Sequence, residues 1–517
     1  MQEEFGDIFD FSFSGEQAVA IEWQLPEVHA QVDALQQWVC QSAQDGTSAH
    51  VFERGLFDKL LALGKTLFQA FLKLVGPGDF GPAVTLDDGR SVHRSAEQHA
   101  RRLLTVFGEF SMPRWVYSPY AKSKVEFAPT DQRLQLPDGA VSYLLQEWDQ
   151  LLGIEQAFGQ VREVIETILR LPQSVDTLER TNQQMAASAP LFREEQGPVD
   201  LSKEGALLIV TEDNKGIPMV RPVEEKPAGA HRTKGEKANK KQMACIGCVY
   251  SVDRHARTPE QLVATLFRDP DRPKEPAPQA QNKRYWAELS RELDGEDLRG
   301  QDLVFQHLQA EIDTRRKPQQ WLIHLCDGQA SLETDRQTYL SEDAHTLDIL
   351  DLMHVLPRVW EAAHVFHAEA SVAASAFVRH HLSQILHGKI GNVIAHWRRQ
   401  GTRQGLTGAK KKNLRALCAF LEKNKYRMRY DEYLRLGCPV ATGVIEGACR
   451  HVIKDRMERA GMRWKVPGAQ AMLNLRTIHT NGDWAAFQDF RIALETDGLY
   501  PNTKAYEARE WPAFQAA

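Results

Sequence analysis

The segment from Gly443 to Trp464 places one carboxylate, Glu446, at the start of a strongly basic stretch. Apolar residues recur at every fourth position from Val444, which predicts a helix with one apolar face. Glu446, Arg450 and Lys454 form a second stripe with the same spacing on another face. An acid in the first turn followed by cations suits a metal ligand beside a phosphate backbone. The stripe is equally typical of a solvated helix face with ordinary ion pairs.

Two aspartates follow apolar runs that predict buried strands. Residues 206–210 lead towards Asp213, and residues 321–326 end at Asp327. Strand ends are where a sheet presents polar catalytic groups to solvent, although a single Asp there is more often a turn or helix cap. Carboxylate oxygens are the ligands that Mg²⁺ prefers, and two such ions about 4 Å apart can assist phosphoryl transfer. With Glu446, these residues supply the three acids that such chemistry needs.

The charge distribution points to an anionic polymer as partner. The net charge of the 517 residues is −6, but residues 1–50 carry nine acids and no bases, whereas residues 379–465 carry 20 Lys and Arg against six Asp and Glu. Phosphate contacts would supply the affinity of this basic half for such a polymer. At 26% charged and 42% hydrophobic residues, the composition is that of a globular protein.

The sequence shows neither a targeting signal nor a cysteine pattern typical of disulfides. No apolar run approaches the ~18 residues of a membrane span, and the first fifty residues contain no Lys or Arg for a secretory signal. We therefore expect no membrane partner and a cytoplasmic location. The seven cysteines are scattered and odd in number, which favours reduced thiols over disulfides. Cys245 and Cys248 form the only CxxC pair. They lie in an apolar stretch that predicts a strand at 243–252 rather than a zinc site.

Periodicity predicts an α/β protein with a mixed-sheet core and a large helical insertion. We expect helices at 28–39, 57–75, 142–180 and 352–367, further helices up to 316 after a polar loop at 268–284, and strands at 206–210, 216–220, 243–252, 321–326 and 346–350. The domain prediction is a helical, acidic region (1–90), a small β element with a helical DNA-binding region and a linker at 183–202 (91–200), the first part of the core (201–368), a basic helical insertion (369–435) and the rest of the core (436–517). A helix-turn-helix at 142–180 is only weakly signalled.

Four motifs together resemble the DDE transposases of bacterial insertion sequences, and most closely the ISKra family, which is related to Mutator-like transposases. They are Gly443-Val-Ile-Glu-Gly-Ala-Cys-Arg-His, Lys454-Asp-Arg-Met-Glu-Arg-Ala-Gly-Met-Arg-Trp464, Asp351-Leu-Met-His354 and Leu325-Cys-Asp-Gly-Gln329. The resemblance, from about residue 90 to 490, implies an RNase H-like core preceded by a mainly helical DNA-binding region. It assigns Asp213, Asp327 and Glu446 as catalytic metal ligands for two Mg²⁺ ions, with Mn²⁺ as a substitute. It further implies strand cleavage and joining of the 3′-OH to target DNA by a homo-oligomer, expected to be a dimer associated with the nucleoid.

The first motif departs from its relatives. They commonly read Asp-Gly-Lys-Gly, whereas this chain reads Asp213-Asn214-Lys215-Gly216. Asn tolerates the left-handed conformation better than most residues, so we expect a turn here to survive. Glu212 should face the other side of the strand and should not replace Asp213.

Further residues are assigned to catalysis or DNA binding. Asp351-x-x-His354 resembles a signature that Mutator-like transposases carry after the second acid. His354 could therefore contact the scissile phosphate or a metal-bound water, or be a buried histidine satisfied by Asp351. Trp464 could stack on an unpaired base or anchor the core. The expected DNA contacts are Arg232, Lys234, Lys240 and Lys241 in a basic loop, and Arg450, Lys454, Arg463 and Trp464 in the glutamate segment.

Two other functions stay open. An RNase H-like nuclease would cleave DNA without strand transfer, and a retired transposase would bind DNA without cleaving it. The Asn214 departure and the acidic N-terminus give the second alternative slight support.

Overall fold

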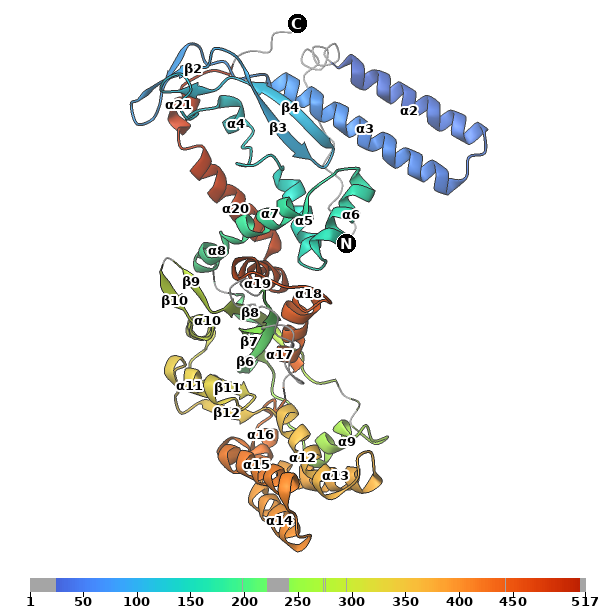
Figure 1. Cartoon of the computed structure of the whole chain (residues 1–517), viewed down its shortest axis with the longest axis vertical. Coiled ribbons are helices and arrows are strands. Elements are labelled where there is room, and N and C mark those ends of the chain that lie inside the picture. Colours follow the sequence, from blue (N-terminus) through green and yellow to red (C-terminus); the bar gives the residue numbers. More distant parts are fainter. Residues whose placement is uncertain are drawn as a thin grey trace, which may run out of the picture. The chain divides into compact units, whose positions relative to one another are not determined.

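The computed structural model describes residues 25–511 except 198, 221–240, 273, 275, 294 and 442. They form two compact units (Figure 1). The first contains the described residues up to Thr181 and from Gln488 onward, and the second runs from Asn182 to Phe487. The predicted C-terminal part of the core, 436–517, is therefore divided between the units.

The first unit begins with a long helical hairpin. Helices α2 (Pro26–Gln44) and α3 (Ala49–Val75) include both predicted N-terminal helices, and α3 ends where Gly76 adopts a φ of 75°. The remaining helices are α4 (Pro129–Arg133), α5 (Tyr143–Gly153), α6 (Phe158–Leu169), α7 (Val175–Ala186), α20 (Trp484–Leu499) and α21 (Thr503–Glu507), of which α7 and α20 cross the boundary between the units.

The predicted small β element is present and larger than expected. Strands β1 (Ala83–Thr85), β2 (Ser91–Arg94) and β5 (Tyr117–Ser118) form one antiparallel sheet. Strands β3 (His99–Thr105) and β4 (Gly108–Arg114) form a hairpin. On this hairpin Phe110 and Met112 pack against Leu72 of α3, which joins the helical hairpin to the β element through a small apolar cluster.

The linker expected at 183–202 is mostly helical. Helix α7 continues to Ala186, and α8 (Ala189–Glu195) follows after two residues. Met185, Ala189 and Phe192 are buried, so one side of these helices packs inward.

The second unit is built on a five-stranded mixed sheet of order β12-β11-β6-β7-β8. Its strands are β6 (Leu207–Pro218), β7 (Lys241–Val252), β8 (Gln281–Leu289), β11 (Trp321–Cys326) and β12 (Thr346–Leu350). Strand β11 is parallel to β6 and β12, whereas β7 is antiparallel to β6 and β8. The α/β prediction and the bounds of β11 and β12 are confirmed.

The two strands expected at 206–210 and 216–220 are one strand. Every residue of β6 pairs with β7, including Asp213 with Ile246 and Asn214 with Cys245. Because β7 pairs with β6 along its whole length, the polar residues between the two apolar runs of β6 also pair with β7. The expected turn and left-handed Asn214 were therefore wrong. Gly216 instead lets the Lys241 side chain lie close to the backbone of β6, because a Cβ at position 216 would lie 2.9 Å from Cδ of Lys241.

Residues 281–298 contain three strands where helices were expected. After β8, strands β9 (Arg291–Leu293) and β10 (Glu296–Leu298) form a short hairpin. The helix α10 (Gly300–Arg315) begins only then. The charged residues at the start of β8 are typical of a polar loop, so the sequence did not predict this strand. Its second half, which includes Trp286 and Leu289, is buried.

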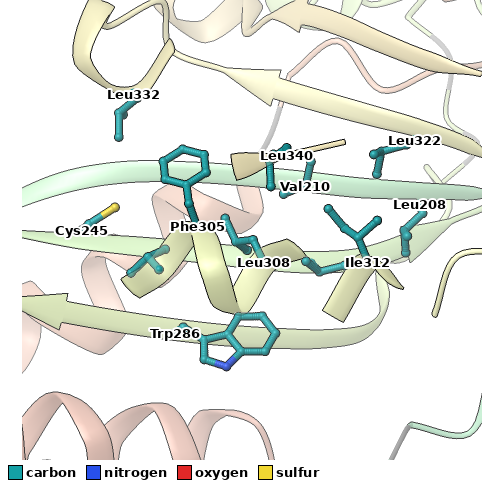
Figure 2. Packing of buried hydrophobic residues seen from close by; sticks show 12 residues of the cluster. Leu208, Val210, Cys245, Trp286, Phe305, Leu308, Ile312, Leu322, Leu332 and Leu340 are labelled. Atoms are coloured by element: carbon teal, nitrogen blue, oxygen red, sulfur yellow. The ribbon is translucent and has the colours of Figure 1, made fainter. Parts of the chain in front are cut away.

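The apolar core of this unit lies between the sheet and α10. Phe305, Leu308 and Ile312 of α10 meet side chains from β6, β7, β8 and β11 (Figure 2). Leu332 of α11 (Ala330–Tyr339) and Leu340 close the cluster. Side chains on the other face of the sheet thus stand on a rigid, buried support.

Helices follow β12, and the stretch expected as a basic helical insertion, 369–435, is helical. These helices are α12 (Leu352–Phe366), α13 (Val372–Leu386), α14 (Ile390–Arg403), α15 (Gly408–Asn424) and α16 (Tyr430–Arg435), while α9 (Pro259–Leu266) packs on α13. Among the 20 basic residues at 379–465, 17 are exposed, so the positive charge lies on the surface. The chain returns to the sheet through α17 (Gly443–Ala448), the π-helical η4 (Cys449–Lys454), α18 (Asp455–Met457) and α19 (Val466–Thr480).

No helix in the described residues is long and apolar enough to cross a membrane. The seven cysteines are free thiols, six of them buried. Cys245 and Cys248 lie three residues apart on β7 and so point to opposite faces of the sheet. They cannot bind one ion together, which agrees with the strand interpretation.

Candidate active site

Asp213 and Asp327 occupy equivalent positions on neighbouring parallel strands. The pairing of β6 with β11 runs from Leu207–Trp321 to Val210–His324 with an offset of 114 residues. Asp327 follows Asp213 by the same 114 residues, three positions beyond the last pair. Alternation along a strand directs both carboxylates to the face away from α10.

The Asp213 carboxylate is held by three groups. Its Oδ2 atom accepts hydrogen bonds from Lys215 Nζ at 3.0 Å and from Cys449 Sγ at 3.2 Å, and Oδ1 accepts from the backbone amide of Asn214 at 2.6 Å. Burial lowers the pKa of Lys215, but the bond to Asp213 outweighs this effect, and the net pKa is raised. Lys215 is therefore fully charged at neutral pH and neutralises the carboxylate.

Asp327 sits in a tight turn directly after β11. Its Oδ1 atom accepts from the backbone amide of Gln329 at 2.7 Å, and Gly328 allows the turn with a φ of 84°. Burial raises the pKa of Asp327, and the neighbouring carboxylate of Asp213 raises it further. A buried acid whose charge is disfavoured by a neighbouring carboxylate is a group that a bound cation would stabilise.

Glu446 is exposed on α17, on the helix that brings Cys449 to Asp213. Glu446 precedes Cys449 by three residues, so both side chains point to the same side of the helix. Its charge also contributes to the raised pKa of Lys215. Glu446 is thus linked to the Asp213–Lys215 pair through the helix that it shares with Cys449 and through this charge effect.

The helix of Glu446 contains a π-helical segment that the sequence did not predict. Residues 449–454 form η4, so the expected regular stripe from Glu446 through Arg450 to Lys454 was wrong in its second half. The buried guanidinium of Arg476 on α19 donates to the backbone carbonyl oxygens of His451 and of Val452, the latter at 2.8 Å. These bonds stabilise the carbonyls that the wider turn exposes. Single π turns within helices are frequent at functional sites.

His354 lies beside the same carboxylates. Asp351 caps α12 by accepting from the amide of Met353, and its Oδ2 lies 3.8 Å from Nδ1 of His354, a charge contact too long for a hydrogen bond. Asp351 raises the pKa of His354, with smaller contributions from Asp327 and Asp213. His354 is partly buried. Its pKa depends on the charges of Asp213 and Asp327, so its imidazole is available as a proton carrier.

The opposite face of the sheet carries a buried ionic ladder. His324 on β11 contacts Glu212 of β6 through Nε2 at 2.9 Å and Asp348 of β12 through Nδ1 at 3.3 Å, and Arg336 of α11 contacts Asp348 at 2.9 Å. Burial lowers the pKa of His324, but Glu212 and Asp348 outweigh it and raise the pKa to about 9. The predicted orientation of Glu212, away from Asp213, is confirmed. The ladder joins the two strands that carry the aspartates.

The predicted DNA contacts fall into three groups. Arg450, Lys454 and Arg463 are exposed on the segment that carries Glu446. Lys241 at the start of β7 is exposed and ion-paired with Glu458. Arg232, Lys234 and Lys240 lie outside the described residues.

Trp464 is buried at 9% exposure. Its Nε1 atom donates to the backbone oxygen of Met457 at 3.1 Å, and the guanidinium of Arg456 lies 5.0 Å from its ring centroid. Its backbone also extends the pairing of β6, through the amide of Val220. This environment favours the alternative of a core anchor over stacking on a base.

Carboxylate oxygens in this arrangement suit Mg²⁺ by chemistry, but they do not form a ready cage. No group of three His, Cys, Asp or Glu side chains converges as a metal site in the described part of the chain. Lys215 and Cys449 occupy Oδ2 of Asp213, so a metal would have to displace the ammonium group.

Three residues of this site were missing from the predicted set. Lys215 could have been found from its spacing of two from Asp213, which places both on one side of a strand. Cys449 could have been found from its spacing of three from Glu446. Arg476 carries no local signal, since only the fold places its guanidinium under η4.

Comparison with solved structures finds a likeness to the Drosophila P element transposase strand transfer complex. The identity is 11% and the TM-score 0.22, and the likeness covers 71% of this chain and 81% of that chain. No family model matches the chain, and no curated protein matches it in sequence. A TM-score this low carries no argument about the site, so a function must be argued from the side chains.

Proposed function

We propose that this protein is a DDE transposase of the ISKra type, which cleaves DNA at insertion-sequence ends and joins the 3′-OH to target DNA. The observation that carries the proposal is the equivalent placement of Asp213 and Asp327 on adjacent parallel strands, with the Glu446 helix held against Asp213 by Cys449. The mixed five-stranded sheet, and the helical insertion between β12 and Glu446, support the RNase H-like core that the motifs imply.

The three acids would hold Mg²⁺, which would supply charge stabilisation at the scissile phosphate. The chain's own groups prepare that site. Asp327 has a raised pKa because it is buried beside Asp213, so a cation there is stabilising. Lys215 holds the Asp213 carboxylate in place, and its ammonium group would be available to a phosphate oxygen if a metal displaced it. His354, whose pKa is raised by Asp351, would serve as a proton donor.

Phosphate binding would fall to the exposed cations that follow Glu446. Arg450, Lys454 and Arg463 lie within eighteen residues of it, and the basic insertion adds further exposed charge. Helices α5–α7 are less suited to this role than expected. Residues 143–186 contain seven acidic and three basic side chains, so phosphate contacts there would be opposed by repulsion.

A DNA-binding protein that no longer cleaves is the second candidate. The ion pair between Lys215 and Asp213, with the thiol of Cys449 on the same oxygen, favours it because both occupy a ligand atom that the metal needs. In that case the cations would still bind DNA.

Supercoiled DNA that carries the terminal inverted repeats flanking the gene would separate these functions. A transposase should nick or cut at the repeat ends with Mg²⁺ and join them to a second plasmid. A nuclease should cut without joining. Saturable binding without any cutting, in Mg²⁺ and in Mn²⁺, would identify the retired form and overturn the proposal.

A further inference from the structure

The turn of Asp327 packs against the helical insertion (369–435). Gly328 follows Asp327 directly, and a Cβ at this glycine would lie 3.6 Å from Oδ1 of Asn424 and 3.6 Å from Cε2 of Phe420. Asn424 ends α15 and is fully buried, and its side-chain amide donates to the backbone oxygen of Phe420 at 2.8 Å. The insertion therefore closes one side of the turn that presents the second aspartate.

A buried arginine, Arg427, contacts the residues around this turn. It lies in η3 (Lys425–Arg427), directly after α15, and is 1% exposed. One amino group of its guanidinium donates to Sγ of Cys326 at 3.1 Å, although 101 residues separate the two in the chain. Its Nε atom donates to Oδ1 of Asn424 at 3.1 Å. The other amino group forms an ion pair with the carboxylate of Glu333 in α11.

These three contacts enclose Asp327 on both sides along the chain. Cys326 precedes the aspartate, and Asn424 lies against the glycine that follows it. Glu333 belongs to α11, the helix into which the turn leads. One guanidinium can serve all three partners because its donors are fixed in a planar fork, which the ammonium group of a lysine lacks. The strand end and the helix on either side of the aspartate are thus fixed to one another.

The thiol of Cys326 connects this contact to the neighbouring strand. Its Sγ atom accepts from Arg427 and donates to the backbone oxygen of Ile349 in β12, 3.6 Å away. Burial raises the pKa of Cys326 to about 12, so the group stays a neutral thiol that can donate and accept. The end of β11 is therefore joined both to β12 and to the insertion through one side chain.

Arg427 is itself held in place by the helix that follows it. The hydroxyl of Tyr430 in α16 donates to the backbone oxygen of Leu350 at 2.8 Å, so α16 lies against β12 (Figure 1). The hydroxyl of Tyr433 donates to the backbone oxygen of Asp348 at 3.2 Å. Both tyrosines are buried. A side chain anchored on packed elements holds its partners more precisely than one on a loop.

We propose that Arg427 is a positioning residue for Asp327, which fixes the turn of the second aspartate from the side of the insertion. Because the guanidinium is buried, it is out of reach of DNA and acts only through Cys326, Asn424 and Glu333. The catalytic part of this inference rests on the proposed function, since it takes Asp327 as a metal ligand. The packing of the turn does not, and it can be measured separately.

The metal dependence of cleavage tests the positioning role. Arg427→Lys keeps a charge beside Glu333 but lacks the fork, so the Mn²⁺ concentration for half-maximal cleavage should rise about 10- to 100-fold while the DNA dissociation constant stays unchanged. Arg315→Lys is the matched control, because Arg315 is equally buried and pairs with Glu204, which precedes β6. This variant should keep the wild-type Mn²⁺ requirement. Equal shifts in both variants would overturn the inference, since they would report a general loss of stability.

Hydrogen exchange tests the packing of the turn without metal or DNA. The amide of Asp351, a buried residue, donates to the backbone oxygen of Cys326 at 2.7 Å, so its exchange rate reports opening at the end of β11. Mass spectrometry should find this exchange at least about tenfold faster in Arg427→Lys than in the wild type, and unchanged in Arg315→Lys. A wild-type rate in Arg427→Lys would overturn the inference. If the wild type does not cleave DNA, the proposed function fails, and the exchange rates still decide whether Arg427 positions the turn.

Discussion

The Sγ atom of Cys449 lies 3.2 Å from Oδ2 of Asp213, although 236 residues separate them in the chain. This contact connects the helix of Glu446 to the strand of the first aspartate. It bridges the two parts of the core between which the helical insertion lies. The position of Glu446 relative to Asp213 therefore depends on it.

Replacing Cys449 should slow cleavage without loss of DNA binding. In Cys449→Ala the helix loses its bond to Asp213, and we expect cleavage about tenfold slower because a small misplacement of a catalytic group is costly. Cys418→Ala removes an equally buried thiol from α15 and serves as the control. Equal cleavage rates for the two variants, measured on the same plasmid, would show that the contact has no positioning role.

Removing Lys215 should strengthen metal binding. The ammonium group competes for Oδ2 of Asp213, so Lys215→Met should lower the dissociation constant for Mn²⁺ several-fold in calorimetric titrations without DNA. Cleavage should nevertheless not improve if Lys215 also contacts the phosphate. Weaker Mn²⁺ binding by this variant would mean that Lys215 organises the site rather than competing in it.

Stability should fall as the pH rises above neutrality, because of His324. Its folded-state pKa of about 9 lies above the ordinary value of about 6.5, so its contribution is fully present below pH 6.5 and is lost as the pH approaches 9. The loss should amount to about 3 kcal/mol in the free energy of unfolding. Urea unfolding between pH 6.5 and 8.5 should show a slope in the wild type that disappears in His324→Gln. The same slope in both proteins would assign it to other groups.

Much of the second unit could be predicted because its strands are short apolar runs. β11 and β12 were predicted to the residue, and the parallel pairing of β11 with β6 places Asp327 level with Asp213. The polar middle of β6 was expected to form a turn because its pairing with β7, the next strand along the chain, leaves no mark on its own local pattern. The π segment at 449–454 could not be predicted, since it is stabilised by Arg476 of another helix. Tertiary contacts of this kind leave no local pattern.

Neutralising the cations behind Glu446 should weaken DNA binding evenly across sequences. Arg450→Gln, Lys454→Gln and Arg463→Gln together should reduce the slope of log affinity against log salt by roughly 3, because three phosphate contacts are lost. Changing Lys59, Lys65 and Lys73 of α3 to Gln removes the same charge and should leave the slope unchanged. A loss confined to one DNA sequence, with an unaltered slope, would indicate base readout instead.

The most direct test of the catalytic assignment separates cleavage from binding. Asp213→Asn, Asp327→Asn and Glu446→Gln each remove a negative metal ligand with little change in volume, and Asp455→Asn removes an exposed carboxylate from the same helix as a control. Strand cleavage with Mg²⁺ should collapse by a factor of about 1000 or more in the first three and persist in the fourth. Binding to the terminal repeats should be retained in all four, because the affinity comes from Lys and Arg. Cleavage by Glu446→Gln at close to the wild-type rate would show that Glu446 is not the third ligand and would contradict the account of this site.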